Sequence, residues 1–120
     1  QIQSWLQSNK VYKLYLCNMK TIDVQALNEK IKAGETLNLV DVREPAEHSE
    51  FNIGGILLPL GDIRVGDTES IDHLKEQEVF LYCRSGNRSG QAAMVLESLG
   101  FTNVINVTGG MLSWRDNFPG

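Results

Sequence analysis

Short runs of hydrophobic residues alternate along the chain with segments whose apolar residues recur at helical spacing. Residues 37–42, 79–82 and 103–107 are mainly apolar runs bounded by polar or glycine-containing stretches, a pattern typical of buried strands. Residues 53–59 carry two glycines inside an apolar run and predict a turn followed by a short strand. Strands that alternate with helices favour an α/β sheet.

Helices are predicted between these strands. Apolar positions in residues 24–33 keep helical spacing, with Asp23 as the predicted N-cap and Gly34 as the stop. Pro45 suits the first turn of a short helix over residues 46–50. The connections between the strands therefore have the helical content that a parallel sheet requires.

Two more helices are predicted in the second half of the chain. One covers residues 85–99 and ends at Gly100. The other follows Gly109-Gly110 and carries Met111 and Trp114, whose i, i+3 spacing indicates core packing rather than a ligand site.

The chain divides into two predicted parts. Residues 1–18 form an N-terminal extension, because Met19 begins a segment that resembles a natural start, and residues 19–120 form the domain. The extension has enough apolar residues to dock on the domain, and its pattern leaves docked and frayed arrangements equally open.

Composition restricts the class of protein. With 120 residues, 42% of them hydrophobic, the chain is long enough to close one core. The formal net charge of −4, with no long Lys/Arg run, argues against nucleic acid or an anionic membrane as the main partner. No run approaches the ~18 apolar residues of a membrane span, and no secretory signal is evident, so we expect a cytoplasmic protein.

Two cysteines, Cys17 and Cys83, are too few for a disulfide-built scaffold and suit a reducing compartment. We expect Cys17 to be a structural or exposed thiol, with a resolving thiol for an oxidised Cys83 as the alternative. His48 and His73 are expected to be solvated, and neither lies in a cluster with metal-ligand spacing. No metal and no cofactor are predicted.

The candidate chemistry lies where the 79–82 strand ends. Cys83 follows the strand directly, and a loop of small and polar residues then opens the next helix; its members are Arg84, Ser85, Gly86, Asn87, Arg88 and Ser89. Successive N–H groups in such a loop form an anion-binding nest. Helix N-termini and neighbouring Arg residues favour the thiolate over the thiol. The context therefore predicts a nucleophile at Cys83 rather than a buried structural cysteine.

Individual loop residues have specific expected roles. Arg84 and Arg88 are expected either to attract an anionic substrate or simply to be solvated and paired along the helix. Gly86 is expected to relieve crowding where the loop turns. Ser89 is expected to cap the helix or to donate into the loop.

Asp41 and Arg43 lie at the end of the 37–42 strand, on the same predicted edge of the sheet as Cys83. We expect them to form a hydrogen-bond network that braces the loop. The alternative is an ordinary surface pair that contributes less than ~1 kcal/mol.

Four segments in this order resemble a single-domain rhodanese: Asp41-Val42-Arg43-Glu44-Pro45, Ile53-Gly54-Gly55, the loop from Cys83 to Ser89, and Gly109-Gly110-Met111-Leu112-Ser113-Trp114. The resemblance covers residues 20–117. Residues 52–63 are particularly similar to rhodanese domains attached to sulfur-carrier-activating enzymes. The family's usual His-Ile-Pro-Gly-Ala is replaced here by Asn52-Ile53-Gly54-Gly55-Ile56, a departure confined to a structural turn.

The resemblance implies a rhodanese-like α/β domain over residues 19–120, with a five-stranded parallel sheet flanked by helices on both faces. It also implies a thiosulfate sulfurtransferase. Cys83 would take the sulfane sulfur of thiosulfate or a similar small donor as a persulfide, which the amides of residues 84–89 would stabilise. The sulfur would then pass to a thiol, to cyanide or to a sulfur-carrier protein.

Two alternatives belong to other functional classes. The same fold houses cysteine-dependent phosphatases and arsenate reductases built on Cys-x5-Arg, whereas the spacing here is Cys83-x4-Arg88 and predicts a loop too small to encircle phosphate. A rhodanese-like binding module without catalysis is the second alternative. Because such modules often lack the cysteine, the retained Cys83 favours the enzyme.

Overall fold

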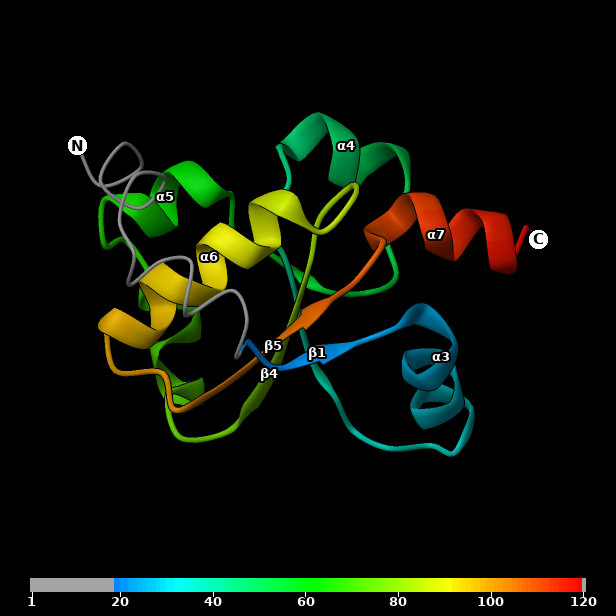
Figure 1. The fold of residues 1–120 in the computed structure, drawn as a ribbon. Coiled ribbons are helices and arrows are strands. Elements are labelled where there is room, and N and C mark those ends of the chain that lie inside the picture. Colours follow the sequence, from blue (N-terminus) through cyan, green and yellow to red (C-terminus); the bar gives the residue numbers. More distant parts are fainter. Residues whose placement is uncertain (1–18, 120) are drawn as a thin grey trace.

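The computed structural model describes residues 19–119, which form a five-stranded sheet in which all neighbouring strands run parallel (Figure 1). The strand order is β1-β5-β4-β2-β3, so β4 lies at the centre. The strands are β1 (Thr21–Ile22), β2 (Asn38–Asp41), β3 (Ile56–Leu57), β4 (Glu78–Tyr82) and β5 (Asn103–Val107). The predicted α/β class and the five-stranded parallel sheet are both confirmed.

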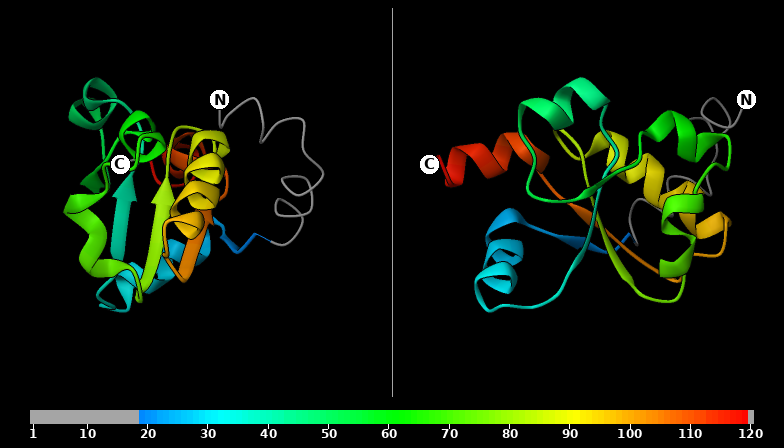
Figure 2. Two further views of the ribbon diagram at one scale, coloured as in Figure 1. Left: turned by 90° about the vertical axis from the view of Figure 1, so that its left-hand side faces the viewer. Right: turned by 180° about the vertical axis from the view of Figure 1, so that it is seen from behind.

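Helices cover both faces of this sheet (Figure 2). They are α3 (Val24–Lys32), α4 (Pro45–Glu50), α5 (Leu60–Arg64), the 3-10 helix η1 (Glu69–Leu74), α6 (Asn87–Ser98) and α7 (Gly110–Asn117). One core contains apolar residues of α5, η1 and α6, and the other contains residues of α3 and α7. The sheet therefore lies between two hydrophobic layers.

The side-chain alternation of β4 decides which layer each residue enters. Val79, Leu81 and Cys83 belong to the core beneath α5 and α6, whereas Phe80 and Tyr82 belong to the core beneath α3 and α7. Successive residues of a strand point to opposite faces, so the run is apolar throughout because both faces are buried. The same alternation directs Cys83 toward α6.

Most predicted elements are present with small shifts in their ends. The Asp23 carboxylate caps α3 by accepting the Ala26 N–H at 2.8 Å. The helix expected to begin at Ser85 begins at Asn87. Strand β1, helix α5 and η1 were not predicted. Expectations about Cys17 and about docking of residues 1–18 fall outside the described residues.

The strands point toward one end of the molecule, where α4 lies beside the first turns of α6 and α7 (Figures 1 and 2). Because all strands are parallel, the residues that follow β2 and β4 meet at this carboxyl edge, where open α/β sheets bind their ligands. Within residues 19–119, every helix is too short or too polar to cross a bilayer.

Candidate active site

Cys83 is fully buried directly after β4, and its sulfur has two polar neighbours. The Gly86 N–H donates to Cys83 Sγ at 3.0 Å, and Ser89 Oγ lies 3.4 Å from the same atom. The predicted contacts of the loop with the sulfur are thus present for one amide and one hydroxyl. Although Cys83 belongs to an apolar core, its Sγ faces hydrogen-bond donors rather than hydrocarbon alone.

Gly86 makes this turn possible. Its φ of +103° lies in the left-handed region that residues with a Cβ rarely adopt. This conformation directs the Gly86 N–H back to the sulfur while the chain proceeds into α6. The expected role of Gly86, relief of crowding in the loop, is consistent with this geometry.

The start of α7 holds the other side of the loop. The Met111 N–H donates to the Cys83 carbonyl at 2.9 Å, and the Leu112 N–H donates to the Arg84 carbonyl at 3.0 Å. Gly110 permits this approach, since a Cβ there would lie 2.5 Å from the Cys83 oxygen and 2.6 Å from the Arg84 oxygen. The Gly109-Gly110 motif is therefore part of the site and not only a turn.

Asn106, near the end of β5, is a site residue that sequence reasoning missed. Its side chain contacts the loop at two points: Ser89 Oγ donates to Asn106 Oδ1 at 2.5 Å, and Asn106 Nδ2 donates to the Gly86 carbonyl at 3.2 Å. It is only 7% exposed. The sequence feature that could have identified Asn106 is its place as a polar residue inside an apolar strand. Buried polar side chains are usually hydrogen-bonded, so such a residue indicates a partner nearby.

Asp41 and Arg43 form a buried, bidentate pair. Arg43 Nε donates to Asp41 Oδ1 at 2.9 Å and Arg43 Nη2 donates to Asp41 Oδ2 at 2.7 Å. Asp41 is 0% exposed and Arg43 is 5% exposed. Arg43 Nη2 also donates to the Phe51 carbonyl at 2.5 Å, just beyond α4. This is not the surface pair of the alternative. Its recorded hydrogen bonds hold α4 rather than the Cys83 loop directly.

The expectation that His48 is solvated is wrong. His48 Nδ1 lies 2.9 Å from Asp41 Oδ2, and the side chain is 23% exposed. The reason is tertiary packing: α4 lies across the end of β2, and this brings the His48 imidazole to the carboxylate of Asp41, seven residues earlier in the chain. His73 is exposed, as expected.

Arg88 does not project freely into solvent or toward a substrate. It forms a bidentate pair with Glu47 of α4, at 2.7 Å and 2.8 Å, which joins α4 to α6. The hydrogen bond from Arg88 is the main cause that lowers the pKa of Glu47 from 4.5 to about 2. The same hydrogen bond raises the pKa of Arg88. Of the two loop arginines, Arg88 is thus neutralised by a partner.

A cavity of about 180 Å³ opens beside the loop, lined by Arg43, Glu47, Glu50, Arg84, Met111, Leu112 and Arg115. Arg84 is exposed, and its side chain makes no hydrogen bond or ion pair with residues 19–119. Cys83 does not line the cavity, but two lining residues are its neighbours: Arg84 follows it in the chain, and Met111 donates to its carbonyl.

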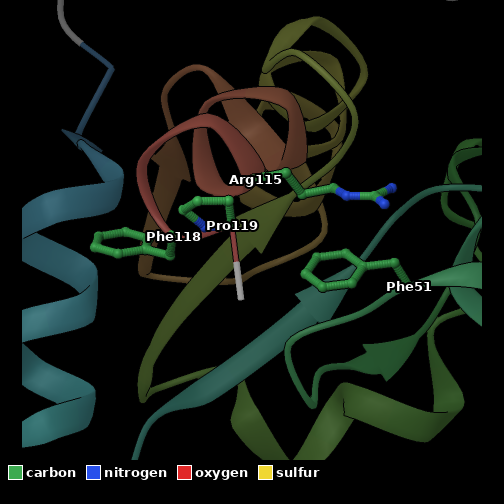
Figure 3. Close-up of a pocket in the computed structure, with 4 residues that line it drawn as sticks. All are labelled: Phe51, Arg115, Phe118 and Pro119. Carbon is green, nitrogen blue, oxygen red and sulfur yellow. The ribbon is translucent and has the colours of Figure 1, made fainter.

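A larger cavity of about 450 Å³ lies at the end of α7, lined by Phe51, Arg115, Phe118 and Pro119 (Figure 3). The Arg115 guanidinium stacks 4.9 Å from the centre of the Phe51 ring. Arg115 borders both cavities, so they are neighbours. The larger one holds no nucleophile, so its size does not make it the better candidate. Residues 19–119 contain no group of three or more His, Cys, Asp or Glu residues placed to hold a metal ion.

Known proteins resemble this chain over most of its length. The sequence model of the family described as "Rhodanese-like domain" matches residues 23–117. The Bacillus subtilis protein named "Putative sulfurtransferase YtwF" is 42% identical over 101 residues, covering 81% of this chain and 91% of that protein. An Allochromatium vinosum protein named "Sulfurtransferase" is 37% identical over 100 residues, covering 82% and 91%.

Two further comparisons concern a longer relative and a solved structure. The Bacillus subtilis "Putative sulfur carrier protein YrkF" is 36% identical over 94 residues, which are 78% of this chain, and the match spans only 49% of that protein. The crystal structure of a rhodanese-like domain protein from Staphylococcus aureus superposes with a TM-score of 0.71 at 30% identity, covering 80% of this chain and 91% of that one.

Proposed function

Because the chain belongs to the rhodanese-like domain family, we propose that it is a sulfurtransferase in which Cys83 carries sulfane sulfur as a persulfide. The observation that carries the proposal is the hydrogen bond from the Gly86 N–H to the Cys83 sulfur, 3.0 Å long, at the carboxyl edge of the sheet. Relatives named as sulfurtransferases support the reaction class. A thiolate enzyme suits a reducing compartment, so we place the reaction in the cytoplasm.

The first half-reaction takes sulfur from thiosulfate or a similar donor. The Cys83 thiolate attacks the outer sulfur, the S–S bond of the donor breaks, and sulfite leaves with the electron pair. The negative charge lies on the terminal sulfur of the persulfide, which the loop amides stabilise as fixed donors and to which the Ser89 hydroxyl can turn its hydrogen. Arg84, with no recorded partner within residues 19–119, supplies the cation that attracts the sulfonate.

The second half-reaction returns the enzyme to its starting state. An acceptor thiolate or cyanide attacks the terminal sulfur, and the Cys83 thiolate leaves. This two-step covalent scheme predicts ping-pong kinetics. A sulfur-carrier protein is a further acceptor that we propose, supported by the similarity to YrkF.

Burial of Cys83 adds a requirement to this scheme. No solvent reaches the residue in the described conformation, so the loop must open for a donor to contact Sγ. Arg84 lies on the exposed part of this loop and adjoins the 180 Å³ cavity, which marks the side from which a donor enters.

The test is sulfur loading in a Cys17→Ser background, where Cys83 is the remaining thiol. After incubation with thiosulfate, we expect a mass gain of one sulfur atom on Cys83 and release of one sulfite. Cys83→Ser in the same background is the matched control and should gain nothing. Addition of cyanide or a small thiol should then remove the sulfur.

Three results would contradict the proposal in different ways. Hydrolysis of a phosphoester without a sulfur adduct would indicate the phosphatase. Reduction of arsenate by the thiol would indicate the arsenate reductase. Absence of any adduct on a folded protein, with each donor tried, would indicate the non-catalytic binding module.

A further inference from the structure

Asn106 lies in an unusual position for a polar side chain. Strand β5 is otherwise apolar from Val104 to Val107, and Asn106 is buried within it at 7% exposure. Both functional atoms of its amide are used: Oδ1 accepts from Ser89 Oγ at 2.5 Å, and Nδ2 donates to the Gly86 carbonyl at 3.2 Å. A buried amide that satisfies both its oxygen and its nitrogen fixes the groups that it contacts.

The two residues that Asn106 contacts, Gly86 and Ser89, are the two that have a polar group beside the sulfur. Gly86 donates its N–H to Cys83 Sγ at 3.0 Å, and Ser89 Oγ lies 3.4 Å from Sγ. Within the described part of the chain, Asn106 makes no hydrogen bond to Sγ itself. We propose that Asn106 is a positioning residue of the sulfur site, which acts through Ser89 and Gly86 by holding both residues beside Cys83. This inference rests on the proposed sulfurtransferase function.

The single hydrogen of the Ser89 hydroxyl makes this role specific. Three acceptors surround the hydroxyl: Asn106 Oδ1 at 2.5 Å, the Gly86 carbonyl at 3.2 Å and Cys83 Sγ at 3.4 Å. A hydroxyl donates to one acceptor at a time and accepts through its lone pairs. In the described geometry the shortest contact, with Asn106, takes the hydrogen. The Ser89 oxygen is then free to accept the hydrogen of the Cys83 thiol.

Ionisation of the sulfur changes the preferred acceptor. A charged acceptor forms the stronger hydrogen bond, so the Ser89 hydrogen turns from Asn106 Oδ1 to Sγ when the thiolate or persulfide anion is present. The step is a rotation, in which one hydrogen bond breaks, one forms and no covalent bond changes. Asn106 Nδ2 meanwhile keeps its hydrogen bond to the Gly86 carbonyl, so the Gly86 N–H stays on the sulfur.

Without Asn106, the Ser89 side chain loses its shortest contact, the one that holds its oxygen beside the sulfur. The Gly86 peptide also loses its link to β5. Both effects remove stabilisation from the anionic sulfur, and hydrogen bonds to charged groups are among the stronger ones in proteins. We therefore expect the variant Asn106→Ala to load sulfur ~10-fold more slowly.

The experiment measures single-turnover loading of Cys83 from thiosulfate by mass spectrometry, in the Cys17→Ser background. Asn103→Ala is the matched control: Asn103 lies on the same strand, its side chain accepts only from exposed Lys20, and its loss should leave the rate unchanged. Asn106→Leu, of similar shape but without hydrogen bonds, provides a second variant if the alanine variant does not fold. Thermal unfolding of each variant is recorded in parallel.

A double-mutant cycle with Ser89→Ala separates positioning from simple support of the fold. If Asn106 acts through Ser89, its removal should cost ~10-fold in the Cys17→Ser background but only about 2-fold when Ser89 is already alanine. Equal losses in both backgrounds, or normal loading by the folded Asn106 variants, would overturn the inference. If the Cys17→Ser protein itself gains no sulfur, the proposed function fails instead, and the two failures are thereby distinguished.

Discussion

Two neighbouring segments at the carboxyl edge of the sheet are held in place by different kinds of interaction. The first part of the sulfur loop, residues 83–86, is held mainly through its backbone: α7 amides bind the Cys83 and Arg84 carbonyls, and the Gly86 N–H binds the Cys83 sulfur. Helix α4 is held through charged side chains: Glu47 forms an ion pair with Arg88 of α6, and Arg43 donates a hydrogen bond to the Phe51 carbonyl.

This difference indicates how each segment responds to change. Backbone hydrogen bonds do not depend on the ionisation of a side chain, but they require main chains to approach closely, so glycines are decisive in the loop. Ion pairs depend on pH, on salt and on the presence of both partners. Substitution should therefore affect α4 through charge and the sulfur loop through size.

The largest effect on stability is expected when the pair beneath α4 is broken. Asp41→Ala leaves Arg43 as a buried guanidinium without its carboxylate, and such a loss costs about 3–5 kcal/mol of unfolding free energy. Chemical denaturation followed by circular dichroism measures the change.

The control for this prediction removes both charges. The double variant Asp41→Leu/Arg43→Met leaves no unpaired ion and should recover most of the lost stability, because apolar residues often replace a buried pair at little cost. A loss of less than about 1 kcal/mol in Asp41→Ala would mean that the pair behaves as an exposed one, and α4 would then need another explanation for its position.

A somewhat smaller loss is expected when the close approach of α7 to the loop is blocked. Gly110→Ala places a Cβ against the carbonyls of Cys83 and Arg84, at a residue whose φ is +54°. The overlap and the left-handed backbone together should cost about 2–3 kcal/mol. Sulfur loading should slow as well, because the Met111 and Leu112 amides would move off the loop. Thermal unfolding and the loading assay measure the two effects.

Gly34 offers a matched control for the backbone conformation alone. Its φ is +81°, but a Cβ there would meet no atom within 4 Å. Gly34→Ala should therefore cost only about 1 kcal/mol, with normal sulfur loading. If the two glycine variants lose equal stability, the contact between α7 and the loop is not what fixes the loop.

The sequence was sufficient to predict the central strands and the position of Cys83 directly after β4. Strand β5 occupies the predicted residues 103–107, because an apolar run between turns allows few other structures. Strand β1 was missed because it has only two residues, defined by pairing with β5. Helix α5 and η1 have five and six residues, too few for a helical period to be recognised.

The partners of the site residues were harder to predict than the residues themselves. Cys83 and its loop follow from local order along the chain, but Glu47 and Arg88 are 41 residues apart in sequence. Their pairing depends on how α4 crosses the carboxyl edge, which is a tertiary property. The same holds for His48 on Asp41 and for Asn106 on Ser89.

The smallest expected effect concerns the pH response of α4. The pKa of Glu47 in the folded protein is lowered to about 2, from 4.5, chiefly by the hydrogen bond from Arg88. A carboxylate with a lowered folded pKa contributes its full stabilisation above its unfolded pKa and loses it as the pH falls from about 4.5 toward 2. Glu47→Gln has no such titration, so its stability should fall less over this window than that of the wild type.

The size of this difference follows from exposure. The side chains of Glu47 and Arg88 are 30% and 32% exposed, so solvent screens the pair and its contribution should be about 1 kcal/mol or less. Denaturant unfolding at several pH values between 3 and 6 would measure it in Glu47→Gln and in the control Glu50→Gln, whose pair with Arg115 is more exposed. The control should follow the wild type. If Glu47→Gln also followed the wild type, charge would not be what joins α4 to α6, and the contrast between the two segments would fail.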